Sequence, residues 1–111
     1  LSAEMKRLFP DQTLRDVPLD HPIFHAFYDI QSLLQVPNIG LAGTGRTHEF
    51  DGYVAHAKGI FDEAGRLMVL VNWNTDLGDA WEWADDPRYP LRYSTYAFEM
   101  GVNIIIYSLL Y

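Results

Sequence analysis

Hydrophobic residues recur along the chain at two different spacings, which predict helices near both ends and a pair of strands between them. A short helix is expected from Ala3 to Phe9, with Ser2 as its N-cap and Pro10 ending it. Its apolar face is formed by Leu1, Met5, Leu8 and Phe9. Two prolines within residues 10–19 indicate a connecting loop.

A second helix is expected from His21 to about Leu34, with Asp20 as N-cap and Pro22 in the first turn. Its buried side would consist of Phe24, Phe27, Tyr28 and Ile30. Residues 36–52 then read as an ordinary loop. They contain GLAGTGR, which is rich in glycine but lacks the lysine and the spacing of a phosphate-binding loop.

Two strands follow. Residues 54–61 alternate imperfectly between apolar and polar positions, whereas Leu67–Trp73 is strongly apolar and is typical of a buried strand. The sequence between them, from Asp62 to Gly65, predicts a hairpin turn in which the glycine takes a positive φ. These segments predict a buried strand pair, followed later in the chain by a C-terminal helix.

A polar, tryptophan-rich loop is expected between Trp73 and Pro90, and a last apolar segment from Leu91 to Tyr111. The period of that segment favours a helix through Tyr96, Met100, Ile104 and Tyr107, although VNIIIYSLL would also suit a strand. Its apolar run is far shorter than the roughly 20 residues that span a bilayer, so no transmembrane helix is expected.

The composition narrows the classes of function. Of 111 residues, 49% are hydrophobic, which is enough material for a folded core. The net charge of −7 argues against nucleic acid and an anionic membrane as partners, because both attract clustered lysine and arginine. With no cysteine, disulfides, thiolate nucleophiles and cysteine-ligated zinc are excluded. The sequence requires no cofactor and identifies none. The start, LSAEMKRLFP, has neither an initiator methionine nor a signal-peptide pattern, and we expect further residues upstream.

Three blocks of the sequence carry a resemblance to a known family. They are RLFPDQ, LDHPIFHAFYDI and KGIFDEAGRLMVLVNWNTDLGDAWEWADDPRYPLRYSTYAFEMGVNIIIY. They resemble the C-terminal half of DUF4159, a bacterial domain of unknown function. The resemblance implies a flavodoxin-like layered fold, similar to class I glutamine-amidotransferase-like and trehalose-utilisation-like domains. Residues 1–111 would then be the C-terminal portion of one α/β domain whose N-terminal half is absent.

The same resemblance implies an exported, periplasmic or envelope-associated protein, with a cytoplasmic location as the alternative. A half-domain exposes an unpaired sheet edge, so other protein chains are the expected partners. Glutamine amidotransferases use a cysteine, a histidine and an acid. The segment that would supply the histidine, LMVLVNWNTDLGD, has Asn72, Asn74 and Asp76 instead, which argues against that chemistry.

The first candidate site is the loop after the apolar strand, because open α/β sheets bind ligands beyond the carboxyl ends of their strands. Its polar and aromatic residues are Asn72, Asn74, Asp76, Asp79, Trp81 and Glu82. Converging oxygens would suit a hard cation, and tryptophans among acids would suit a sugar. The alternative is a loop whose acids only cap backbone N–H groups.

Two further candidates lie outside that loop. His21 and His25 are four residues apart and would share a helix face, with Asp20 beside them, which is a possible spacing for metal ligands. Helix capping and packing is the other interpretation. Arg46 could bind a carboxylate or phosphate, alone or with His48, Glu49 and His56; a solvated loop is the alternative.

Three functions remain open from the sequence. The leading hypothesis is a non-catalytic binding or scaffolding subunit of a larger bacterial assembly. The second is a carbohydrate- or metal-binding domain at the tryptophan-rich loop. The third is a hydrolase of amidotransferase-like fold that lacks the Cys–His pair and pairs Asp76, Asp79 or Glu82 with a histidine.

Overall fold

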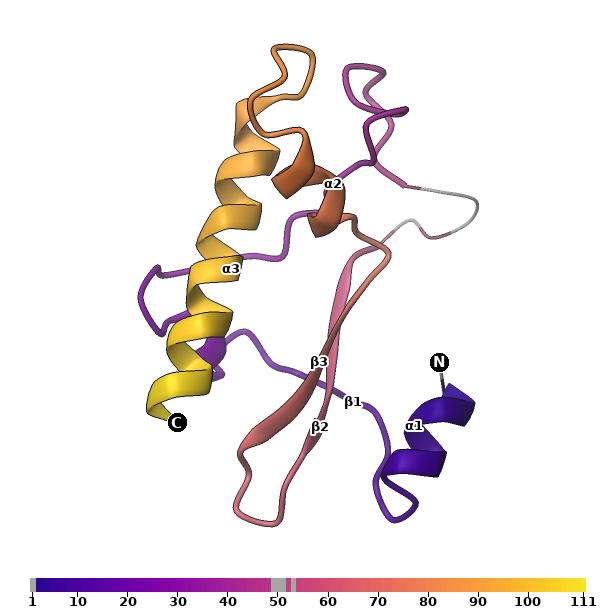
Figure 1. The fold of residues 1–111 in the computed structure, drawn as a ribbon, viewed down its shortest axis with the longest axis vertical. Coiled ribbons are helices and arrows are strands. Elements are labelled where there is room, and N and C mark those ends of the chain that lie inside the picture. The colour runs from indigo at the N-terminus through magenta and orange to yellow at the C-terminus, as the bar shows by residue number, and fades with distance from the viewer. Residues whose placement is uncertain (1, 49–51, 53) are drawn as a thin grey trace.

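The computed structural model describes residues 2–48, 52 and 54–111. The elements are α1 (Ser2–Leu8), β1 (Arg15–Asp16), η1 (Pro22–Phe24), β2 (His56–Phe61), β3 (Leu67–Trp73), α2 (Leu77–Glu82) and α3 (Leu91–Leu110). Figure 1 shows α3 on one side of the β2–β3 hairpin and α1 on the other, with α2 near the upper part of α3. The long helix α3 packs against α2 and η1.

The sheet has the order β1-β2-β3, and both strand pairs are antiparallel. The central strand is β2, in which Ala57, Ile60 and Phe61 are buried. The predicted strand Leu67–Trp73 is confirmed as β3, but the prediction that it is buried is wrong. It lies at the edge of the described sheet, and Met68 and Trp73 are each 40% exposed. The flavodoxin-like arrangement implied by the resemblance stays a prediction.

The predicted helix from His21 to Leu34 is wrong. Only the three-residue 3-10 helix η1 forms there, and His21 caps it. Beyond η1 the backbone N–H groups of Phe27 and Tyr28 donate to the side chain of Asn103. Their hydrogen bonds are therefore made with a distant residue instead of within a helix.

Two segments predicted as loops contain regular structure. Residues 10–19 include β1, which pairs with the middle of β2. The segment after Trp73 includes α2, whose N-cap is Asp76. The turn before β3 agrees with the prediction, because Gly65 has a φ of 84°.

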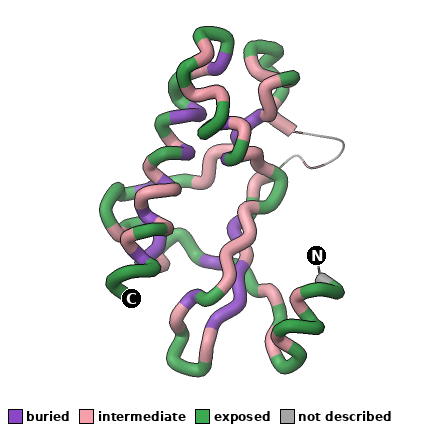
Figure 2. The backbone as a smooth tube through the Cα atoms, in the orientation of Figure 1, coloured by how far each residue is buried: buried purple, intermediate pink, exposed green. Residues whose placement is uncertain are grey.

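Both terminal helices are confirmed, α1 to within a residue or so at each end and α3 along its full length. Of the four residues predicted to face the core from α3, Met100 and Tyr107 are buried, and Tyr96 and Ile104 are partly buried against the core. Figure 2 shows buried positions along α3 and β2, whereas α1 is largely exposed. Within the described residues, no helix has the length and apolar character needed to cross a membrane.

Candidate functional site

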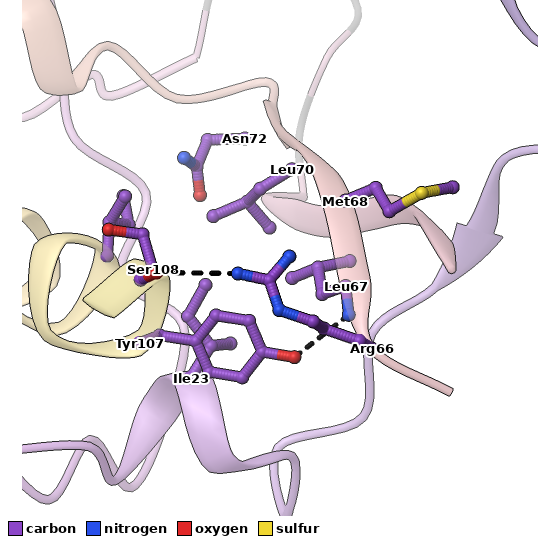
Figure 3. Close-up of a pocket in the computed structure, with 9 residues that line it drawn as sticks. Ile23, Arg66, Leu67, Met68, Leu70, Asn72, Tyr107 and Ser108 are labelled. Carbon is purple, nitrogen blue, oxygen red and sulfur yellow. Dashed lines mark hydrogen bonds between the residues drawn. The ribbon is translucent and has the colours of Figure 1, made fainter. Parts of the chain in front are cut away.

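A cavity of about 300 Å³ lies between β3 and α3. We call it the β3–α3 groove, and its lining residues are Ile23, Arg66, Leu67, Met68, Leu70, Asn72, Ile104, Tyr107 and Ser108. Figure 3 shows Leu70 and Asn72 projecting from β3 toward α3, while Arg66 reaches across to the end of α3. Leu70, Ile104 and Ile23 make its surface partly apolar, and Arg66 and Asn72 add polar groups.

Arg66 and Tyr107 connect β3 and α3 at one end of the groove. The Arg66 guanidinium donates to the carbonyls of Tyr111 and Ser108 at the C-terminus of α3, where a positive charge also complements the helix dipole. It lies 5.9 Å from the centre of the Tyr107 ring. The Tyr107 hydroxyl in turn accepts a 2.8 Å hydrogen bond from the backbone N–H of Leu67. These contacts tie the start of β3 to the end of α3.

Asn72 lies further along the groove. Its side chain is half-buried, and among the described residues it has no hydrogen-bond partner. The amide points toward α3 in Figure 3. Its donor and acceptor atoms are therefore available to a molecule in the groove.

At Leu70 and Asn72, the backbone N–H and C=O groups of β3 point away from the neighbouring strand β2. The carbonyl of Ala57 accepts from Val17, so the backbone groups of Ala57 point toward β1. Because these directions alternate along a strand, Lys58 and Ile60 pair with β3 instead. Asn72 lies opposite Ala57 and Leu70 opposite Gly59, so both present their backbone N–H and C=O groups to the outside of the sheet.

The two aspartates of the predicted site are engaged in local structure. The Asp76 carboxylate accepts from the backbone N–H of Asp79 at 2.9 Å, which caps α2. The Asp79 carboxylate accepts from the backbone N–H of Ile39 at 2.8 Å and so joins α2 to the preceding loop. Burial and these two nearby carboxylates raise the pKa of Tyr89, whose hydroxyl donates to the carbonyl of Pro37 at 2.6 Å.

The other residues of the predicted loop site point in different directions. Asn74 has a φ of 58°, and its amide donates to the carbonyl of Val54 at 2.9 Å. The Trp81 indole donates to the carbonyl of Ala97 at 2.7 Å, which anchors α2 on α3. Glu82 is exposed. The structure therefore brings only Asn72 of this set into the β3–α3 groove, and Arg46 lines a separate cavity.

The two candidate metal ligands also have separate partners. The Nδ1 atom of His21 accepts from the backbone N–H of Ile23 at 3.1 Å and caps η1. His25 contacts the Asp29 carboxylate through Nδ1 and the Leu19 carbonyl through Nε2 at 2.7 Å. In the part of the chain that the structure describes, no group of three or more histidine, aspartate or glutamate residues is placed to hold a metal ion.

Sequence reasoning did not identify Arg66, Tyr107 or Ser108 as groove residues. Arg66 lies just before a strand and the other two lie near the end of a helix, so nothing in their spacing links them. They meet because the β2–β3 hairpin and α3 lie side by side (Figure 1).

A family model described as a domain of unknown function, DUF4159, matches residues 1–109. The chain belongs to this family. The DUF4159 match runs over nearly the whole chain, so it does not depend on the C-terminal block alone. No curated protein and no solved structure matches the chain. The likeness of DUF4159 to amidotransferase-like domains stays a prediction.

Proposed function

We propose that this DUF4159 chain is a non-catalytic binding subunit that holds an extended segment of another protein along the free edge of β3. The observation that carries the proposal is the outward-facing backbone of Leu70 and Asn72 beside a partly apolar groove. An incoming strand can hydrogen-bond to such an edge, and its alternate side chains then enter neighbouring pockets.

The lining of the groove favours a bound segment whose apolar side chain lies next to a polar backbone group or a side-chain amide. Ile23, Leu70 and Ile104 provide apolar contacts, and the side-chain amide of Asn72 provides one donor and one acceptor group. The hydrogen bonds of Arg66 and Tyr107 already orient these two side chains, which reduces the ordering that a partner has to impose.

The chemistry of the lining supports binding over catalysis. Among the described residues that line the groove there is no carboxylate and no imidazole, the usual groups for general acid–base catalysis. The Ser108 hydroxyl donates to the carbonyl of Ile105 at 2.7 Å. Hydrolysis by Asp76 or Asp79 finds less support, because both carboxylates accept backbone N–H groups. The same engagement weakens carbohydrate or cation binding at that loop.

The proposal also includes the assembly, the location and the overall fold of the protein. Membership of a larger assembly, a periplasmic location and an amidotransferase-like fold are proposed from the resemblance. Among the described residues β3 is an edge strand, and such an edge supports pairing with a strand of a partner, since unprotected edges otherwise promote uncontrolled pairing.

The test uses a soluble heptapeptide of alternating valine and lysine, whose positive charge complements the net charge of −7. We expect it to shift the NMR amide signals of Leu70 and Asn72 and to slow their hydrogen exchange. Asn72→Pro removes the outward backbone donor and should abolish these changes. The matched variant Asn72→Ala keeps that donor, loses only the side-chain amide and should weaken the changes much less.

Two results would overturn strand addition at this edge. One is the absence of any peptide-induced shift in β3 at millimolar concentration. The other is equal binding by Asn72→Pro and Asn72→Ala, with both variants folded as judged by their remaining NMR signals.

A further inference from the structure

A second cavity, of about 240 Å³, lies between the glycine-rich loop and the start of α3. We call it the arginine pocket, and its lining residues are Pro37, Leu41, Gly43, Gly45, Arg46, Pro90, Arg92 and Tyr93. The loop and the first turn of α3 both lie at the upper end of the molecule in Figure 1. The cavity is distinct from the β3–α3 groove, with which it shares no residue.

Two arginines from different parts of the chain line this one cavity. The Nε atom of Arg46 donates to the carbonyl of His48 at 2.9 Å, which orients the side chain and leaves its terminal nitrogens for other acceptors. Arg92 donates to the hydroxyl of Tyr93 at 2.6 Å, and its guanidinium lies 4.6 Å from the centre of that ring. Because Tyr93 is buried, it holds Arg92 in place at the start of α3.

Neither guanidinium is neutralised within the described part of the chain. Three other lysine and arginine side chains form ion pairs there: Arg7 with Glu4, Lys58 with Asp16 and Arg88 with Asp86. Arg46 and Arg92 have no carboxylate partner among the described residues. Two like charges that face one cavity repel each other unless an anion lies between them. In a chain with 8 bases against 15 acids, two of the 8 bases therefore line the same cavity.

We propose that the arginine pocket binds a phosphate group, either as free phosphate or as the monoester of a small molecule. Planar guanidinium groups bind phosphate oxygens in a bidentate manner, and two of them match the charge of a dianion. The positive end of the α3 dipole adds to the same field. The cavity is smaller than the roughly 300–1,000 Å³ of pockets for drug-sized ligands, which suits a compact group. This proposal is independent of strand binding at β3.

The test is a titration with inorganic phosphate, followed by the NMR amide signals of the loop and of the first turn of α3. Sodium chloride at equal ionic strength controls for screening. We expect Arg46→Ala and Arg92→Ala each to raise the dissociation constant by about tenfold or more, since each removes a charge-assisted contact. Arg88→Ala is the matched control, because Arg88 lies close in sequence but does not line the cavity.

A parallel titration with phenyl phosphate distinguishes the two sources of the phosphate group. Tighter binding of phenyl phosphate supports a monoester, and tighter binding of inorganic phosphate supports the free ion. The proposal is overturned if phosphate shifts no more signals than sodium chloride does, or if Arg88→Ala weakens binding as much as Arg46→Ala. Arg46 is exposed, so its variant tests the site even if Arg92→Ala destabilises the fold through Tyr93.

Discussion

Asn103, fully buried in the middle of α3, forms two hydrogen bonds with the backbone of Tyr28, which lies 75 residues earlier in the chain. Its Oδ1 atom accepts from the N–H of Tyr28 at 2.8 Å, and its Nδ2 atom donates to the carbonyl of the same residue at 2.8 Å. The same Oδ1 atom accepts from the N–H of Phe27 at 3.0 Å. One side chain therefore holds the segment after η1 against the helix.

Replacing Asn103 by alanine should lower the free energy of unfolding by about 2–4 kcal/mol, because three backbone groups lose their partner near the core. Urea denaturation followed by circular dichroism measures this loss. Thr95→Ala, at an exposed position on the same helix, is the control and should change stability by less than about 0.5 kcal/mol. Equal effects of the two substitutions would contradict the role assigned to Asn103.

Tyr107→Phe should destabilise the protein by about 1–2 kcal/mol, because it keeps the ring but leaves the buried N–H of Leu67 without an acceptor. Tyr111→Phe is the matched control, since Tyr111 is 54% exposed and stacks on Tyr107 through its ring. Thermal unfolding of the two variants measures the difference. A smaller loss for Tyr107→Phe than for its control would argue against the link between β3 and α3.

His25 and His21 should titrate at clearly different pH values. The Leu19 carbonyl and then the Asp29 carboxylate raise the pKa of His25, whereas burial lowers the pKa of His21. The stabilising contribution of His25 is therefore present below its unfolded pKa and is lost as the pH rises through its folded pKa. That of His21 has the opposite sign, because stability is lost as the pH falls and the ring becomes charged.

An NMR titration of the imidazole signals between about pH 5 and 8 tests both directions. We expect His25 to lose its proton at the higher pH. Asp29→Asn should lower the pKa of His25 only in part, because the Leu19 carbonyl still accepts from Nε2. If His21 titrated at the higher pH, the hydrogen bonds assigned to His25 would be refuted.

Hydrogen exchange should alternate along β3 in the free protein. The N–H groups of Val69 and Val71 point toward β2 and should exchange slowly, whereas those of Leu70 and Asn72 point outward and should exchange quickly. Amide exchange measured by NMR at low protein concentration resolves the four residues. Protection of Leu70 and Asn72 in the free chain would mean that the edge is already paired.

Asp79→Ala should lower stability by about 1–2 kcal/mol, because the backbone N–H of Ile39 loses its acceptor. Glu82→Ala, on the same helix and exposed, should have an effect below about 0.5 kcal/mol. Chemical denaturation of both variants gives the comparison. Equal stability of both variants would reopen Asp79 as a ligand-binding residue.

Local patterns predicted the elements that depend on neighbouring residues. The helical period through Met100 and Tyr107 located α3, and the apolar run with Gly65 before it located β3 and its turn. In such segments the backbone hydrogen bonds and the apolar face follow from nearby residues, so sequence spacing is sufficient. The candidate site was predicted less well: of the loop residues, only Asn72 lines the β3–α3 groove.

By itself, the sequence determined the family of this protein, the presence of the long helix α3 and of the β2–β3 hairpin, and the absence of cysteine chemistry. Only the tertiary structure decided that the residues after Phe24 do not continue as a helix and that β3 is an edge strand of the described sheet. It also decided that Asp76 caps α2 and that Asp79 joins α2 to the preceding loop. The reason is that these outcomes depend on partners far along the chain. Asn103 accepts the hydrogen bonds that a helix at Phe27 and Tyr28 would have used, and no local pattern encodes that contact.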